Sequence, residues 1–225
     1  MRLKKLLKII LVAVPALLIV SVLAFAIFQP IQVLPRIRLS PGFSLTDQDG
    51  QRLTNEDLRG KLVLYSFTCT RCGPPGPQSI QTMREVQDRL DEVDLAGIPF
   101  KMVTISFDPE HDTSDVLRAY AEEAGADLSQ WRFVTGDPAR LKHILGSGFE
   151  VYYEPNEDGS FVFDQVFVLV DGWGIIRGDY RYHTVAADTD RILRHISVLV
   201  EEVQQSEGSA RLAYEAAHFF LCYAP

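Results

Sequence analysis

The chain contains few cysteines: three occur among 225 residues. Small secreted scaffolds that depend on disulfides carry four or more cysteines in a much shorter chain, so this sequence does not belong to that class. A chain of this length also buries enough apolar surface to fold without such cross-links. Cys69 and Cys72 form a Cys-x-x-Cys pair, whereas Cys222 lies close to the C-terminal end. The cysteines therefore direct attention to one short segment.

Basic residues are also scarce beyond the first eight positions. Four of the 22 Lys and Arg residues lie in that tail, so the rest of the chain carries 18 of them against 30 Asp and Glu, a net charge of −12. A surface of this sign repels a phosphate backbone. We therefore predict that nucleic acid is not a partner.

No charged residue occurs between Ile9 and Phe28. At about 1.5 Å of rise per residue, a helix over 9–28 covers the ~30 Å hydrocarbon core of a bilayer. The basic tail, residues 1–8, predicts a cytoplasmic N-terminus and an extracytoplasmic main domain by the positive-inside rule. The alternative is a cleaved signal peptide, since Ala24 to Ala26 resembles a cleavage site. Both interpretations place the main domain outside the cytoplasm.

The remaining chain divides into a linker, one domain and an extension. Residues 29–41 contain three prolines and no periodicity, which indicates a linker; 42–205 form the domain, and 206–225 the extension. Apolar runs predict strands at 61–67 and 100–108, a short strand or loop at 131–137 and a strand pair around Asp171-Gly172, and a hairpin precedes them at 43–54. Helical spacing or end signals predict helices at 79–94, 113–125, 138–148 and 188–205. The order predicts an α/β, thioredoxin-like fold, with a mixed central sheet flanked by helices.

The segment "FTCTRCGPPGP" joins the first core strand to its helix. A thiol at a helix N-terminus has its anion favoured by exposed backbone N–H groups and the helix dipole. Cys72 is the cysteine closer to that helix, while Cys69 is still leaving the strand. Thr68 or Arg71 is a candidate to stabilise a Cys72 thiolate, the guanidinium by its charge. The alternatives are a structural disulfide or two buried thiols without chemistry.

At this point the chain resembles the Sco/SenC family of membrane-tethered, thioredoxin-fold proteins that supply copper to cytochrome c oxidase. The resemblance covers about Phe43 to Glu202 and rests on "FSLTDQDG", "LVLYSFTCTRCGPPGP", "VTISFDPEHDTSDVLRAYAEEAGA", "WRFVTGD" and "FDQVFVLVDGWG". It implies copper as the cargo and a copper-oxidase subunit as a partner.

The family's copper site combines a Cys-x-x-x-Cys-Pro turn with a histidine that follows an aspartate. On that pattern Cys72 takes the place of the first cysteine, Gly76 that of the second and Gln165 that of the histidine. Glycine offers no side-chain donor, and an amide oxygen is poorly matched to Cu(I). The resemblance therefore implies a degenerate site with weakened copper binding. "CGPP" also parallels the Cys-Gly-Pro-Cys of thioredoxins, with Pro75 in place of the second cysteine.

Other side chains could supply the missing copper ligands. Cys69 and Cys72 together offer a two-thiolate copper site or a redox-active disulfide. His111, after the second core strand, is a weaker candidate ligand. In the extension, His218 and Cys222 are spaced for one helix face, although apolar docking of this segment is the simpler interpretation.

Three hypotheses follow. The first is a membrane-anchored extracytoplasmic Sco/SenC-like protein that handles copper or thiols during cytochrome c oxidase assembly. The second is an enzyme, a thiol-disulfide oxidoreductase or thiol peroxidase that uses Cys72. The third is an assembly scaffold without chemistry.

Overall fold

The structure is a computed structural model that describes residues 11–17, 19–20, 32–157, 159–181, 188–205 and 214–215. Residues 11–17 and 19–20 are helical and exposed, and the other positions of the predicted anchor at 9–28 lie outside the described residues. Within the described part of the chain, no helix is both long and apolar enough to cross a membrane. His183, His218 and Cys222 also lie outside the described residues.

One mixed sheet forms the centre of the domain. Its strand order is β1-β10-β9-β4-β5-β6-β2-β3. The bounds are β1 Arg38–Leu39, β2 Ser44–Asp47, β3 Arg52–Thr54, β4 Leu62–Thr68, β5 Phe100–Ser106, β6 Trp131–Thr135, β9 Val166–Val170 and β10 Ile175–Arg181. Strands β4, β5 and β6 are parallel, whereas β9 is antiparallel to β4. The carboxyl ends of β4 and β5 therefore meet at one edge, where the cysteine segment begins.

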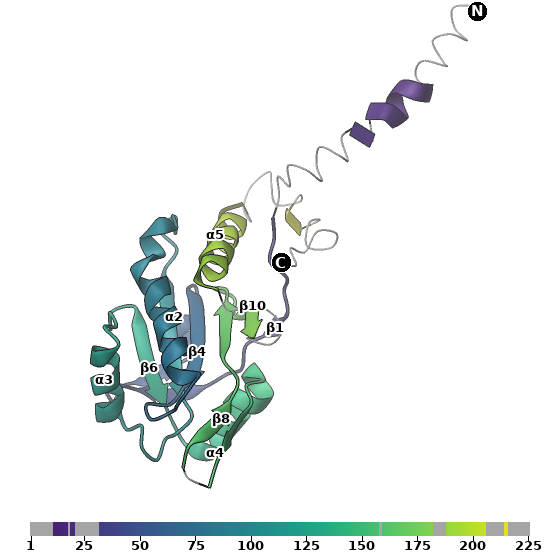
Figure 1. Cartoon of the computed structure of the whole chain (residues 1–225). Helices are drawn as coiled ribbons and strands as arrows, with labels where there is room; N and C mark the ends of the chain where they lie inside the picture. The colour runs from purple at the N-terminus through teal and green to yellow at the C-terminus, as the bar shows by residue number, and fades with distance from the viewer. Residues whose placement is uncertain are drawn as a thin grey trace, which may run out of the picture.

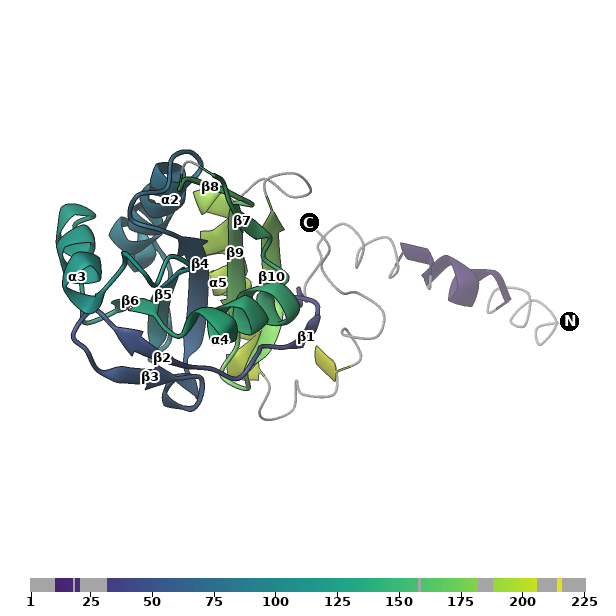
Figure 2. The same cartoon turned by 90° about the horizontal axis from the view of Figure 1, so that it is seen from below.

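The helices cover both faces of this sheet (Figures 1 and 2). They are α2 Gly76–Asp88, α3 Ser114–Glu123, α4 Pro138–Lys142 and α5 Thr189–Gln205, with a π-helical turn at His143–Phe149 and 3-10 turns at Glu56–Leu58 and Leu90–Glu92. Leu62 and Leu64 of β4 pack with α2, α3 and α5, whereas Val63, Tyr65 and Phe67 pack with α4 and the π-helical turn. Both faces of β4 are thus buried, as its continuous apolar run predicts.

The predicted α/β order is confirmed for the core strands and for the four helices. One pair of strands was not predicted: β7 Tyr153–Pro155 and β8 Phe161–Phe163 form a separate antiparallel hairpin. The helix predicted at 79–94 begins earlier, at Gly76, and ends at Asp88, because a separate 3-10 turn follows Arg89.

Residues 32–41, assigned to a linker from their prolines, pack against the domain. Val33 and Leu34 are fully buried, and β1 pairs with β10. The buried guanidinium of Arg177 donates hydrogen bonds to the carbonyl oxygens of Leu34 (2.7 Å) and Pro35 (3.1 Å). Apolar burial and these bonds fix a segment whose proline content alone indicates an irregular chain.

Candidate functional site

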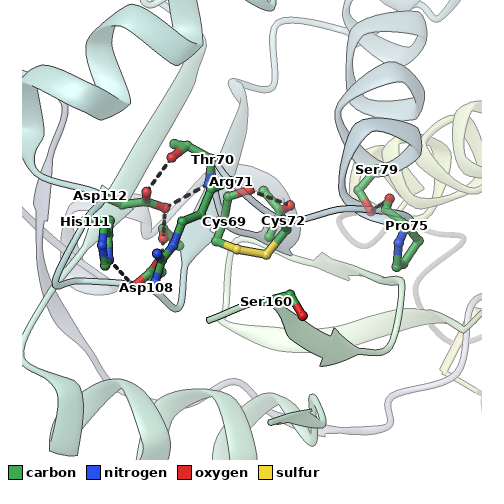
Figure 3. The surroundings of a disulfide bond; sticks show 12 residues. Cys69, Thr70, Arg71, Cys72, Pro75, Ser79, Asp108, His111, Asp112 and Ser160 are labelled. Carbon is green, nitrogen blue, oxygen red and sulfur yellow. Dashed lines mark hydrogen bonds and ion pairs between the residues drawn. A yellow bond between two sulfur atoms is a disulfide. The ribbon is translucent and has the colours of Figure 1, made fainter. Parts of the chain in front are cut away.

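Cys69 and Cys72 are joined by a disulfide at the carboxyl end of β4 (Figure 3). Their Cα atoms are 5.1 Å apart, and the Cys72 N–H donates to the Cys69 carbonyl oxygen over 3.2 Å. Both side chains are buried, with 1% of Cys69 and 7% of Cys72 exposed. Cys72 is therefore the more accessible half of a tight, closed turn.

A proline-rich turn connects this disulfide to α2. The Gly76 N–H donates to the Gly73 carbonyl oxygen (2.9 Å), and the Ser79 N–H to that of Pro75 (3.0 Å). Helix α2 begins at Gly76, so Cys72 precedes it by about one turn and is closer to it than Cys69 is. Cys72 was predicted to lie closer to the helix and Cys69 closer to the strand, and their placement in the structure agrees with this.

The two residues between the cysteines are held by carboxylates from the loop between β5 and α3. Asp112 accepts hydrogen bonds from the N–H (3.0 Å) and the hydroxyl (2.5 Å) of Thr70. Asp108 lies 2.5 Å from Nε of Arg71. Neither aspartate was predicted from the sequence to contact the cysteine turn. Their position after a strand that neighbours β4 was the usable signal.

The ion pair with Asp108 changes the expected role of Arg71. The sequence suggests that its positive charge supports a Cys72 thiolate. In the structure the guanidinium is paired with a carboxylate that is itself 4% exposed. Much of its charge is therefore offset locally, which reduces the electrostatic support it offers to Cys72. Thr68, the other candidate, donates its hydroxyl to the Cys69 carbonyl oxygen over 3.4 Å.

Position 76 lies directly beside Cys72. A β-carbon built on Gly76 would be 3.2 Å from the β-carbon of Cys72 and 3.0 Å from Oγ1 of Thr68. Gln165 is half-buried in the connection between β8 and β9. Continuing the β4–β9 register by two residues from Ser66 and Phe167 brings Thr68 opposite Gln165. Both positions thus lie at the end of β4 that carries the disulfide.

Histidines contribute little to this region of the described chain. Nδ1 of His111 lies 3.2 Å from Asp108, and its side chain is half exposed. Among the residues that the structure describes, no three His, Cys, Asp or Glu side chains are grouped so that they could hold a metal ion. His195, on α5, is buried and hydrogen-bonded to the Tyr180 hydroxyl at 2.7 Å.

A groove of about 810 Å³ runs beside Arg71 and Asp108. Its wall includes Phe107, which packs against Tyr153 (ring centroids 4.9 Å apart) and Phe161 (5.3 Å) of the β7–β8 hairpin. The unpredicted hairpin thus forms one side of the open surface next to the cysteine turn.

The sequence model of one family, SCO1/SenC, matches residues 33–201. The chain belongs to the SCO1/SenC family. Curated relatives include the mitochondrial SCO1 homolog 1 of Arabidopsis thaliana, 28% identical over 159 residues, and the mitochondrial SCO1 homolog of Homo sapiens, 29% identical over 131. These matches cover 68% and 56% of this chain and 46% and 42% of the relatives, so the chain spans about half the length of the curated relatives it matches.

Solved structures of this family share the fold. A SCO1/SenC family lipoprotein from Bacillus anthracis aligns with a TM-score of 0.64 and 24% identity, covering 71% of this chain and 93% of that one. Arabidopsis thaliana ScoI with copper bound aligns with a TM-score of 0.61 and 26% identity, covering 74% and 99%. BsSco, described as a cytochrome c oxidase assembly protein with a disulfide switch, aligns with a TM-score of 0.64 and 22% identity, covering 75% and 97%.

Proposed function

We propose that this SCO1/SenC protein is a membrane-anchored, extracytoplasmic protein that acts in cytochrome c oxidase assembly by thiol-disulfide exchange at Cys69 and Cys72. Its binding of copper through the family's ligand positions is weakened. The observation that carries the proposal is the Cys69–Cys72 disulfide, formed where positions 76 and 165 provide neither a thiol nor an imidazole.

The exchange uses each cysteine once. In the direction that reduces a partner, the Cys72 thiolate attacks the partner's disulfide, releasing one partner thiolate and forming a mixed disulfide. The Cys69 thiolate then attacks the Cys72 sulfur, which releases the second partner thiolate. The Cys69–Cys72 bond forms in that step, and two electrons pass to the partner. The greater exposure of Cys72 and its position next to α2 support its role as the attacking sulfur.

Copper as a cargo fits these side chains poorly. Gly76 has no donor atom in its side chain, and the amide oxygen of Gln165 is a hard ligand for Cu(I). In the oxidised turn the two sulfurs are bonded to each other, so neither is a thiolate. The proposal therefore includes no copper-transfer step.

The anchor is supported by the uncharged run at 9–28 and by the part of it that is described. Residues 11–17 and 19–20 are helical, and large apolar side chains there are exposed, including 74% of Leu11 and 68% of Leu17. Such a surface is stable in lipid and unfavourable in water. With the basic tail on the cytoplasmic side, the SCO1/SenC domain lies outside the cytoplasm.

The test uses the full chain in detergent. We expect the reduced protein to exchange with a model disulfide, glutathione disulfide, and to lose Cu(I) to a competing chelator. Cys72→Ser should abolish the exchange. Tight stoichiometric Cu(I) binding that depends on Cys72 would instead support copper handling. If Cys69→Ser and Cys72→Ser both leave oxidase assembly intact in cells, the protein is a scaffold.

A further inference from the structure

Asp112 is a buried carboxylate placed against the cysteine turn. It is fully buried and accepts three hydrogen bonds, two from Thr70 and one from the hydroxyl of Ser106. Within the described chain, no Lys, Arg or His side chain forms an ion pair with it. A carboxylate satisfied by hydrogen bonds alone makes strong, directional contacts, because each of these bonds is assisted by its charge.

Asp108 holds the second residue of the turn in the same way. It pairs with Arg71, and its backbone N–H donates to Oγ of Ser106 over 3.1 Å. Ser106 therefore connects the two aspartates. We name Ser106, Asp108 and Asp112 the loop brace. Figure 3 shows Asp108 and Asp112 on one side of the cysteine turn, directed at Arg71 and Thr70.

The loop brace comes from a part of the chain 37 to 42 residues away from the turn that it holds. It reaches the turn because β4 and β5 are parallel neighbours, and the Phe107 N–H extends their ladder to the Thr68 carbonyl oxygen (3.2 Å). Both residues between the cysteines are thus fixed to the central sheet. The positions of Cys69 and Cys72 are set by this frame as well as by their own covalent bond.

We propose that the loop brace, chiefly Asp112 acting through Thr70, is a positioning device that favours the disulfide form of the Cys69–Cys72 pair. This inference rests on the thiol-exchange function proposed above. Reduction requires the two sulfurs to move from bonding distance to van der Waals separation, and both are buried. A turn that is held at Thr70 and Arg71 resists that movement, so the thiols stay close and reclose readily.

The equilibrium that reports this effect is exchange with glutathione. Two glutathione thiols give up two electrons and form the S–S bond of glutathione disulfide. The Cys69–Cys72 bond breaks, and both protons pass to the protein thiols. The equilibrium constant for oxidation of the protein in this buffer measures how strongly the frame favours closure.

Thr70→Val in the full chain removes the hydroxyl that donates to Asp112 and keeps the shape of the side chain. We expect the oxidation constant to fall roughly fivefold to tenfold, since part of a charged hydrogen bond is lost selectively from the oxidised form. Thr70→Ser, which keeps the hydroxyl, should restore the constant to within about twofold of wild type. Arg71→Gln, which removes the contact with Asp108 from a partly exposed side chain, should lower it roughly twofold to threefold.

The chain offers a matched control. Thr54 donates its hydroxyl to Asp57 over 2.6 Å on an exposed turn. Thr54→Val removes the same kind of bond away from the cysteines and should leave the oxidation constant unchanged. The unfolding free energies of the oxidised and reduced forms are measured alongside, because a purely structural contact would lower both equally.

The outcomes separate the two proposals. If wild type reaches no equilibrium with glutathione, the proposed function fails. If wild type exchanges with glutathione but Thr70→Val and Arg71→Gln show the same oxidation constant as wild type, the loop brace has no positioning role and the proposed function stands. Should Thr70→Val not fold, Arg71→Gln alone decides, and an unchanged constant overturns the inference.

Discussion

Gly76 lies beside Cys72 so closely that a β-carbon at position 76 would be 3.2 Å from the β-carbon of Cys72. A side chain added at this position would therefore be adjacent to the Cys72 sulfur. On the proposed correspondence with the family's copper site, Gly76 takes the place of the second donor, and its backbone would present a donor side chain next to Cys72. This relationship leads to a direct test of the proposed weakening of copper binding.

Gly76→Cys combined with Gln165→His should give a Cu(I) affinity roughly 100-fold higher than that of wild type, or about 2.7 kcal/mol. Thiolate and imidazole are donors that Cu(I) prefers, and both positions lie at the disulfide end of β4. The measurement is competition with a chromogenic Cu(I) chelator under reducing conditions. Gly73→Cys is the matched control, because a β-carbon there has no neighbour within 4 Å apart from the two residues adjacent to it in the chain. If the Gly73 variant binds copper equally well, any added thiol suffices and the geometry is irrelevant.

The two cysteines should behave unequally in exchange. With Cys69→Ser, the Cys72 thiolate still attacks glutathione disulfide, and the mixed disulfide persists because no second thiol resolves it. Cys72→Ser should form little adduct, since Cys69 is only 1% exposed. Intact-mass spectrometry after a short incubation distinguishes the two variants. More adduct on Cys69 than on Cys72 would reverse the assignment of the attacking sulfur.

His195 should make the stability of the protein depend on pH. Burial, followed by the charges of Arg194 and Arg191, lowers its pKa to about 4. In the unfolded chain this pKa is about 6.5, so below pH 6.5 the unfolded state binds the proton first. The stabilisation is complete above pH 6.5 and is lost as the pH falls toward 4. Between pH 7 and pH 5 we expect a loss of about 1–2 kcal/mol from this group.

The check on this dependence is denaturant unfolding at both pH values for wild type and two variants. His195→Gln should lose the extra 1–2 kcal/mol of acid sensitivity, because glutamine does not titrate in this range. His143→Gln changes an exposed helical histidine and should keep the wild-type dependence. Equal acid sensitivity in wild type and His195→Gln would show that other groups cause it.

The sequence predicted those strands and helices in which buried residues recur at regular spacing along the element. β4 and β9 are buried on both faces and appear as unbroken apolar runs, and α5 has apolar residues at helical spacing. The burial of His195 could also have been predicted from the sequence, because His195 lies three residues after Ile192 and four before Leu199, and both of these are buried.

Contacts between distant segments were not predictable in the same way. Asp108 and Asp112 reach the cysteine turn only through the pairing of β4 with β5, and no local pattern contains that adjacency. The β7–β8 hairpin was missed because its strands have three residues each and one ends in Pro155, which weakens any strand signal. The Cys-x-x-Cys spacing located the pair, but its closure into a disulfide depends on how this frame holds the turn.

Arg177 links the segment that precedes the domain to the core, and its loss should affect both. It is buried between Asp171 (3.1 Å) and Glu202 (2.6 Å) while it holds the carbonyl oxygens of Leu34 and Pro35. Arg177→Met removes the positive partner from two buried carboxylates, so we expect a loss of roughly 3–5 kcal/mol in unfolding free energy. Adding Glu202→Gln should recover part of that loss, because the unbalanced negative charge is reduced.

Limited proteolysis under native conditions should cut Arg177→Met near residues 32–37 faster than Arg59→Met, which loses an exposed guanidinium instead. Equal cleavage rates at that segment would mean that apolar burial alone holds it, and that Arg177 serves only the core.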